Sequence, residues 1–131
     1  MVFDLQQCRE NFKKRLADQQ AERESLRKNA HQTAIAAIAQ VIPHYPQITH
    51  LYLFGSVTQP GQFHPHSDID VAVRGTDANT YFALWRDLEA VCPQWAIDLR
   101  EINQPCHFTD MVLQTGELVY ESQNSPAQGK Y

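Results

Sequence analysis

The chain has 131 residues, which is the length of one folded domain with a single hydrophobic core. Its 43% hydrophobic and 20% charged residues exclude a chain that is disordered throughout. The formal net charge of -4 argues against a protein that holds a long nucleic acid by its phosphates, because such domains are strongly basic. We therefore expect no direct binding to nucleic acid.

The first predicted element is helical and runs from Leu5 to about Ile42 without a Pro or Gly. Its apolar residues recur at helical spacing in both halves, but they almost disappear between residues 17 and 24. Two interpretations are open: two helices, or one long helix whose first half projects from the domain. In the second half, the apolar residues at helical spacing are Leu26, Ala30, Ala34, Ile38 and Val41, and we expect Ile35, Ile38 and Ile42 to share one packed side.

Shorter elements follow this helix. Apolar and β-branched runs predict strands, and amphipathic stretches that end at Pro or Gly predict helices. The strands are expected at 48–54, 68–73 and 95–102, the helices at 80–91 and 109–115, and a short extended piece at 117–121. Helices and strands that alternate in this way indicate a small α/β or α+β domain.

Two carboxylates interrupt the second predicted strand. Side chains alternate between the faces of a strand, so Asp68 and Asp70 point the same way, roughly 7 Å apart. Ile69, Val71 and Val73 then point to the opposite face and into the core. Two carboxylates on one face repel each other unless a cation lies between them, and Mg²⁺ is commonly held by such a pair together with substrate phosphates. The pattern therefore predicts a half-site for Mg²⁺.

A third carboxylate, Asp98, is embedded in the predicted strand at 95–102. If this strand lies beside the second one, Asp98 completes a cluster of three carboxylates with Asp68 and Asp70, which suits two metal ions and a phosphate chain. The structural alternative is a solvated edge or turn, because a D-x-D pair alone is a weak motif.

A Gly-Ser pair ends the first predicted strand. Gly55 has no Cβ, so a phosphate can approach the backbone closely, and Ser56 offers a hydroxyl together with the following N–H groups. A plain turn explains Gly-Ser equally well. The compound pattern carries more information: LFGS at 53–56, then ten residues, then SDIDVAV at 67–73, and finally AIDLRE at 96–101.

This pattern resembles the minimal nucleotidyltransferases (MNT) of the DNA polymerase β-like superfamily, which act as antitoxins beside HEPN-domain toxins. The resemblance covers about residues 35–121. It implies an α/β (α+β) nucleotidyltransferase fold, with a mixed sheet of three or four strands flanked by helices. The chain is then one domain with a helical extension at 1–30, a catalytic core at 31–121 and a flexible tail at 122–131.

The resemblance also implies an activity and its residues. Gly55 and Ser56 would bind the nucleotide phosphates, Asp68 and Asp70 would bind Mg²⁺, and Asp98 would assist the metal or activate the acceptor. The implied reaction moves AMP from ATP to a hydroxyl, that of a tyrosine in a HEPN ribonuclease toxin, and so silences the toxin. The implied partners are ATP and this toxin, in a hetero-oligomer.

The connection at 57–67 departs from the family pattern, because it holds no Lys or Arg where the family carries arginines. This difference weakens the expected hold on the triphosphate. His64 and His66 are partial substitutes, although two solvated loop histidines are the simpler interpretation. Arg74 and Arg100 are stronger candidates for phosphate contacts, and an ion pair with Asp98 also explains Arg100.

Three functions remain open at this point. The first is an active protein AMP-transferase; the second is an inactive MNT-fold module that neutralises a toxin by binding alone, which the arginine-free loop favours. The third is a nucleotidyltransferase for small molecules, for which the chain lacks an extra substrate-enclosing domain.

The N-terminal segment bears on the expected partner, and the cysteines bear on the expected location of the protein. Residues 1–28 carry seven Lys or Arg and five Asp or Glu, and their apolar residues suggest either a docking arm for the partner or a solvated helix. We expect no secretory signal and no membrane contact, three reduced thiols at Cys8, Cys92 and Cys106, and a cytoplasmic protein.

Overall fold

The computed structural model describes residues 4–123. Three helices, two short 3₁₀ turns and four strands follow one another along this part of the chain. Their bounds, in chain order, are α1 (Leu5–Val41), η1 (Ile42–His44), β1 (His50–Phe54), η2 (Gly55–Thr58), β2 (Ile69–Arg74), α2 (Ala78–Val91), β3 (Ile97–Glu101), α3 (His107–Thr115) and β4 (Glu117–Glu121). The α/β order predicted from the sequence is confirmed. The tail expected at 122–131 lies, from residue 124 on, outside the described residues.

The four strands form one mixed sheet in the order β3-β2-β1-β4. β1 pairs antiparallel with both β2 and β4, whereas β2 and β3 are parallel. Parallel neighbours need a long crossover connection, and α2 supplies it between β2 and β3. The mixed sheet that the family resemblance implied is therefore present.

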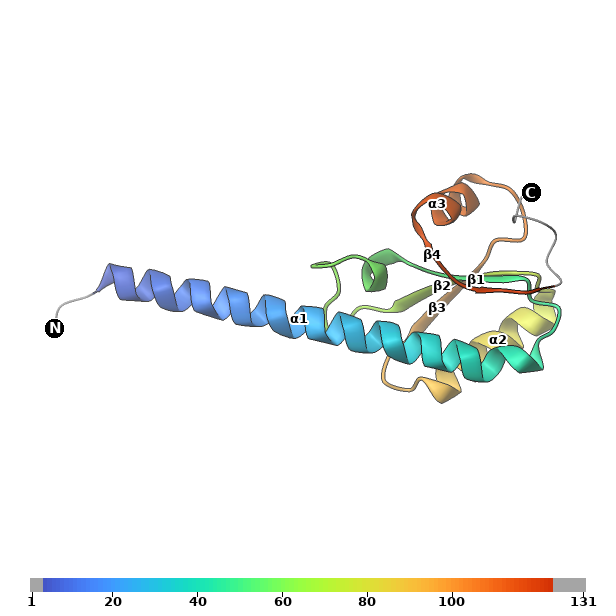
Figure 1. Ribbon diagram of the computed structural model, residues 1–131, viewed down its shortest axis with the longest axis horizontal. Coiled ribbons are helices and arrows are strands. Elements are labelled where there is room, and N and C mark those ends of the chain that lie inside the picture. Colours follow the sequence, from blue (N-terminus) through green and yellow to red (C-terminus); the bar gives the residue numbers. More distant parts are fainter. Residues whose placement is uncertain (1–3, 124–131) are drawn as a thin grey trace.

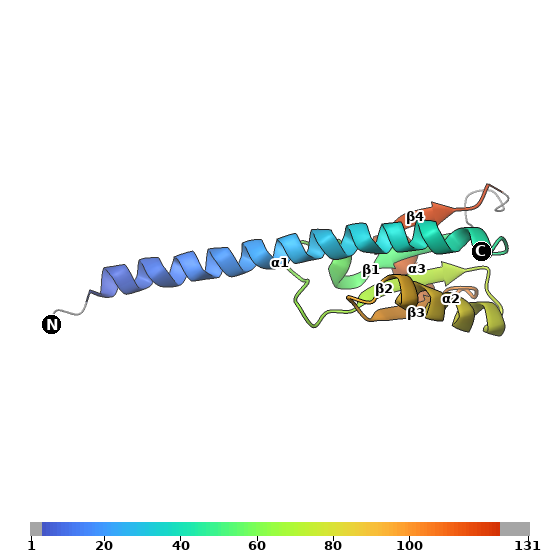
Figure 2. The ribbon, with the colours of Figure 1, turned by 90° about the horizontal axis from the view of Figure 1, so that it is seen from below.

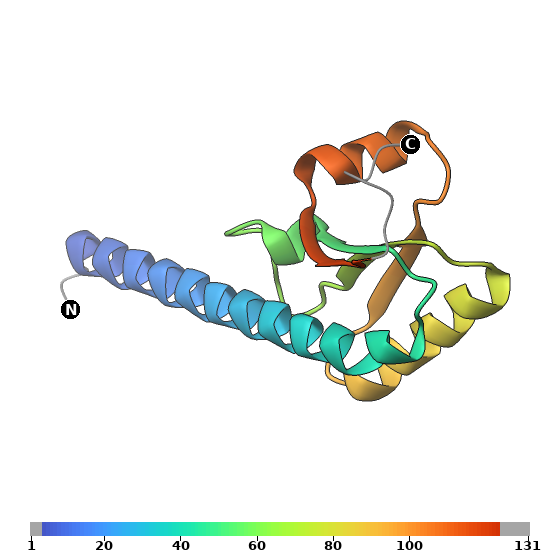
Figure 3. The same cartoon turned by 45° about the vertical axis from the view of Figure 1, so that its right-hand side comes forward.

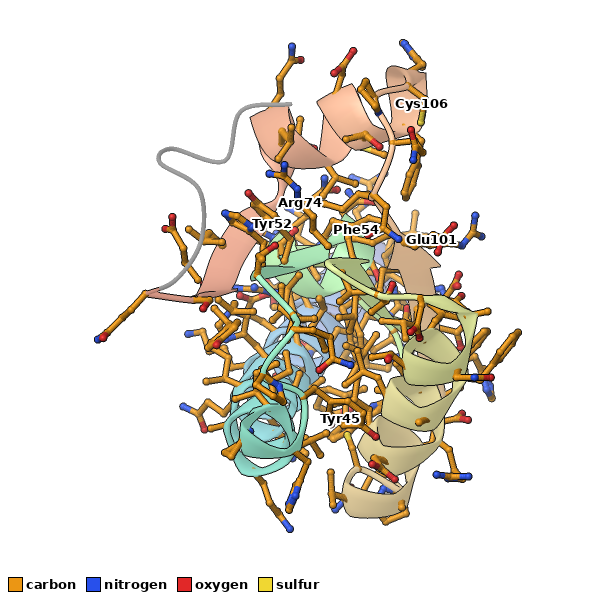
Figure 4. The ribbon with its side chains drawn as sticks, turned by 90° about the vertical axis from the view of Figure 1, so that its right-hand side faces the viewer. Tyr45, Tyr52, Phe54, Arg74, Glu101 and Cys106 are labelled. Carbon is orange, nitrogen blue, oxygen red and sulfur yellow. The ribbon has the colours of Figure 1, made fainter. Side chains whose placement is uncertain are left out.

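The helices lie on both faces of this sheet. Figures 1 and 2 show α1 and α2 side by side on one face, while α3 lies on the opposite face. In Figure 4, Tyr45 lies between α1 and α2, and Tyr52 and Phe54 lie on the side of the sheet that faces α3. The main core fills the α1/α2 side, and a smaller cluster of Tyr52, Ala72, Ile102 and Val112 fills the α3 side.

α1 is one continuous helix of 37 residues, so the second interpretation of its pattern is confirmed. Every residue from 4 to 23 is exposed, and Figures 1 and 3 show this half extending beyond the sheet. The helix starts at Asp4, whose side chain accepts a hydrogen bond from the N–H of Gln7 at 3.1 Å. Such an N-cap satisfies one of the free N–H groups of the first turn.

The packed side of α1 follows the apolar spacing read from the sequence, except at Ile35. The buried residues are Ala30, Ala34, Ala37, Ile38 and Val41, whereas Ile35 is 38% exposed. Small alanine side chains allow the helix to approach the sheet closely, so its inner stripe is made mostly of them rather than of isoleucines.

No helix in residues 4–123 has the length and apolar character needed to cross a membrane.

Candidate active site

The residues of interest gather at one end of three neighbouring strands. Phe54, the last residue of β1, is paired with Asp70 of β2, and Asp70 is paired with Asp98 of β3. Gly55 and Ser56 follow directly after β1, and Asp68 precedes β2. The expectation that the strands carrying Asp70 and Asp98 are neighbours is therefore confirmed.

The second strand has the two faces that its alternation predicted. Ile69, Val71 and Val73 are buried in the main core, with exposed fractions of 0%, 1% and 0%. Asp70 is partly buried on the other face of the strand, the face on which α3 lies. A carboxylate is thus fixed on a strand whose opposite side is anchored in the core.

Gly55 is required by the local geometry. Its φ of +71° lies in the left-handed region, which residues with a Cβ rarely adopt. A Cβ placed on Gly55 would lie 2.2 Å from Oδ2 of Asp70, well inside the contact distance of real atoms. The backbone of the turn and the carboxylate of Asp70 therefore lie directly against each other, and only glycine fits between them.

The surroundings of Asp70 disfavour the ionised form of its carboxyl group. Burial, followed by the negative charges of Asp98 and Asp68, raises its pKa from 3.8 to about 6, and the positive charge of Arg100 opposes this shift only partly. A carboxylate whose ionised form is disfavoured in this way gains stability from a nearby cation. The site thus has the electrostatic character of a cation-binding position.

Asp98 is already paired within the chain. The Nε and one Nη of Arg100 donate to its two carboxylate oxygens, at 3.0 and 3.4 Å. The guanidinium of Arg100 also lies over the ring of Phe108, 5.9 Å from the centroid, and Phe108 packs edge-to-face on Phe54. An ordinary ion pair thus accounts for Arg100, as the sequence had left open.

In this arrangement no three His, Cys, Asp or Glu side chains among residues 4–123 are grouped closely enough to hold a metal ion. The expected closed cluster of three carboxylates is therefore not formed. The donor chemistry nevertheless suits a hard divalent cation, because carboxylate oxygens are its preferred ligands and Asp70 lacks full charge compensation. Asp68 and Asp70 could hold such an ion without breaking an ion pair. Asp98 could become a further ligand only after its ion pair with Arg100 is broken.

The remaining candidates are placed less favourably. Both His64 and His66 are exposed in the connection, as expected of solvated loop histidines. Arg74 is the last residue of β2, four residues beyond Asp70, so the two lie roughly 13 Å apart along the strand. Arg74 is therefore a weaker candidate for phosphate contacts than its place in the sequence suggested, and this contact stays a prediction.

One contact near the site had no signal in the sequence. The side chain of Arg27, in the middle of α1, donates to the carbonyl of Val57 directly after Ser56, at 3.0 Å. The two residues are 30 positions apart, and no pattern of spacing connects them. Only the fold brings this arginine to the loop that lacks arginines of its own.

Known proteins were compared with the chain at the level of family, sequence and structure. The family model described as "Polymerase beta, Nucleotidyltransferase" matches residues 36–125. None of the curated proteins compared with the chain matches it.

Three solved structures show the likeness in fold. A toxin-antitoxin crystal structure with AMP-PNP is 26% identical, with a TM-score of 0.56, and the match covers 68% of this chain and 74% of that chain. A mutant of the toxin-antitoxin MntA-HpeT is 23% identical, with the same TM-score and coverage. A complex of tri-AMPylated Shewanella oneidensis HEPN toxin with MNT antitoxin is 21% identical, with a TM-score of 0.52, and the match covers 72% and 74% of the two chains. With the family match over more than half of the chain, these findings show that the chain belongs to the polymerase beta nucleotidyltransferase family.

Proposed function

We propose that the chain is an antitoxin that transfers AMP from ATP to a hydroxyl, that of a tyrosine, in a HEPN ribonuclease toxin and thereby neutralises it. The observation that carries this proposal is the sheet register, which brings the Gly55-Ser56 turn, Asp70 and Asp98 to one end of the sheet. Family membership supports the transfer of a nucleotide. The similarity to a toxin-antitoxin structure with AMP-PNP supports ATP as the donor and a toxin as the acceptor.

Each residue then has a distinct part in the reaction. Gly55 and Ser56 hold the triphosphate through the N–H groups of their turn and the Ser56 hydroxyl, and the missing Cβ of Gly55 lets Asp70 lie directly against that turn. Asp68 and Asp70 hold Mg²⁺, and Asp98 completes the set as a further ligand or as the acceptor of the hydroxyl proton. Bound Mg²⁺ supplies positive charge that neutralises the triphosphate and the leaving pyrophosphate.

The proposed step balances as a simple displacement. The acceptor oxygen forms a bond to the α-phosphorus of ATP, and the bond from this phosphorus to the oxygen bridging to the β-phosphate breaks. Pyrophosphate leaves, and the hydroxyl proton passes to a carboxylate and then to water. ATP and the proposed toxin partner are both found in the cytoplasm, which is therefore the proposed location.

The experiment is a transfer assay on intact proteins. The chain is incubated with ATP, Mg²⁺ and the HEPN-type protein encoded beside it, and both proteins are weighed by mass spectrometry. We expect the partner to gain one or more AMP units with the wild-type chain and none with Asp70→Asn. Asp110→Asn, an exposed carboxylate on α3, is the matched control and retains transfer. Equal transfer by Asp70→Asn and the wild type would refute the assignment of this carboxylate.

A second candidate is neutralisation by binding alone. Two observations favour it: the connection at 57–67 holds no Lys or Arg, and Asp98 is engaged by Arg100. In the same assay, a stable complex with no gain in mass on either protein would support this candidate. A gain in mass on a small hydroxyl compound, with none on the protein, would instead support a small-molecule nucleotidyltransferase.

A further inference from the structure

The connection after the Gly-Ser turn is held by α1 through a pair of charged residues. Arg27 Nη1 donates to the carbonyl oxygen of Val57 at 3.0 Å, and Arg27 Nε donates to both oxygens of Glu24 at 3.0 Å each. Arg27 first, and the backbone N–H of Gly61 to a smaller extent, lower the pKa of the Glu24 carboxyl below its ordinary value, so this part of the loop lies beside the carboxylate. One point of the loop, Val57, is thus hydrogen-bonded to this turn of the helix, and a second, Gly61, lies next to it.

The ion pair between Arg27 and Glu24 is less exposed to solvent than an ordinary surface ion pair. The side chain of Arg27 is only 14% exposed and that of Glu24 is 30% exposed. The Nη2 of Arg27 also donates to Glu24, so the guanidinium is held as a fork with little freedom. A largely buried arginine with a fixed orientation can hold the peptide group that it contacts in one position.

The Val57 carbonyl is the last of three that fix the turn η2. The Gly55 carbonyl accepts from the Thr58 hydroxyl at 2.8 Å, and the Ser56 carbonyl accepts from the N–H of Gln59 at 3.1 Å. These two bonds lie within the loop itself. Only the third, from Arg27 to Val57, ties the peptide planes of the turn to the body of the protein.

The segment at residues 59–62 is not held in place by apolar packing. Val57 and Phe63 are buried, but the four residues from 59 to 62 are exposed. A cavity of about 550 Å³, lined by Gln20, Arg23, Glu24, Pro60 and Gly61, lies between the loop and α1. Glu24 therefore lies beside a part of the loop that is not packed against the helix, whereas Arg27 contacts the turn at Val57, whose side chain is buried in the core.

We propose that Arg27, held by Glu24, is a positioning residue for the nucleotide-binding turn at 55–58. The inference rests on the proposed function, and it assigns to a residue of α1 the ordering of a loop that has no basic side chain of its own. Arg27 acts on the nucleotide through the peptide group of Val57. Its loss lets the turn move, so that nucleotide binds more weakly.

The test compares nucleotide affinity among matched variants. The full chain is titrated calorimetrically with ATP and Mg²⁺ as the wild type, Arg27→Gln, Arg27→Lys and Lys28→Gln. Lys28 is an exposed neighbour, so Lys28→Gln removes the same charge from the same turn of helix. We expect Arg27→Gln to bind ATP about tenfold more weakly, Arg27→Lys to recover part of the affinity, and Lys28→Gln to match the wild type.

A readout without nucleotide separates positioning from general stability. Amide hydrogen exchange is measured at residues 55–61 and, as a reference, in β2 and β3. Faster exchange confined to the turn in Arg27→Gln supports the inference. Equal acceleration everywhere means that Arg27 only stabilises the fold, and ATP affinity within about twofold of the wild type likewise overturns the inference.

A second variant and the exchange measurement cover a variant that does not fold and a wild-type chain that binds no nucleotide. If Arg27→Gln does not fold, Glu24→Gln tests the same brace, because it removes the negative charge that fixes the Arg27 guanidinium; the same exchange pattern and loss of affinity are expected. If the wild-type chain binds no nucleotide, the proposed function fails. The exchange comparison then still decides whether Arg27 orders the turn.

Discussion

The short distance between Gly55 and the carboxylate of Asp70 predicts the effect of adding one methyl group at Gly55. Gly55→Ala places a Cβ 2.2 Å from Oδ2 of Asp70, so the carboxylate must retreat by about 0.8 Å to reach 3.0 Å. The substitution also puts an alanine at a φ of +71°, which costs about 1–2 kcal/mol. Forcing the side chain of Asp70 away from its rotamer adds about 0.5–1.5 kcal/mol. We expect a total loss in the free energy of unfolding of about 2–3 kcal/mol.

Gly61 provides a matched control for the backbone term. Its φ is +81°, close to that of Gly55, but nothing lies within 4 Å of the Cβ that an alanine would add. Gly61→Ala should therefore cost only the backbone term of about 1–2 kcal/mol. The difference between the two substitutions, about 1 kcal/mol, isolates the collision with Asp70.

Urea unfolding at neutral pH measures both variants, with midpoints compared at a common slope. The same pair is then measured in an Asp70→Ala background, where the carboxylate is absent and the two substitutions should cost the same. The reasoning is refuted if Gly55→Ala costs no more than Gly61→Ala. It is also refuted if the extra cost persists without the carboxylate of Asp70.

Three further predictions concern charge, packing and the exposed helix. The pKa of Asp70 rises from 3.8 to about 6 on folding, so its contribution to stability is present below about pH 4 and is lost as the pH rises through about 6. Asp70→Asn should therefore raise the free energy of unfolding by about 1–2 kcal/mol at pH 8 and not at pH 4; an equal effect at both pH values contradicts this. Ala34 is 2% exposed, so Ala34→Leu should cost about 1–3 kcal/mol by overpacking, while Ala36→Leu on the exposed side should be neutral in the same urea assay. Phe12 is 58% exposed and Phe63 is 1% exposed, so Phe12→Ala should change the stability by less than about 0.5 kcal/mol and Phe63→Ala should lower it by about 3–5 kcal/mol. A large loss in Phe12→Ala would show that the first half of α1 packs on the domain.

The sequence predicted the strands of the site because their pattern is local. Alternation along β2 requires Ile69, Val71 and Val73 to share the face opposite Asp70, and their burial confirms it. The pairing of Asp70 with Asp98 followed from a single assumption, that β2 and β3 are neighbours. The place of β4 beside β1 could not be predicted, because nothing local in a five-residue strand selects its partner.

Other features depend on tertiary contacts that local patterns do not encode. The helical spacing predicted Ala30, Ala34, Ile38 and Val41 in the packed stripe of α1, but Ile35, expected on the packed side, is exposed and Ala37 is buried instead. The contact between Arg27 and Val57 joins residues 30 positions apart, and the helical pattern at residue 27 gives no indication of it. The distance of Arg74 from Asp70 could be predicted, since the two residues are four positions apart on one strand.

The projecting half of α1 has a consequence for how the protein behaves in solution. A helix of 37 residues is about 55 Å long, whereas a compact domain of some 90 residues has a radius of gyration of about 12 Å. The exposed half of the helix, residues 4–23, therefore adds a rod of about 30 Å to the domain and raises the friction and the largest dimension of a single chain above those of a sphere of the same mass. A monomer would elute from a sizing column earlier than a globular protein of its 15.0 kDa mass and could be mistaken for a dimer. Its association state must be determined by light scattering or by sedimentation equilibrium, which report mass independently of shape.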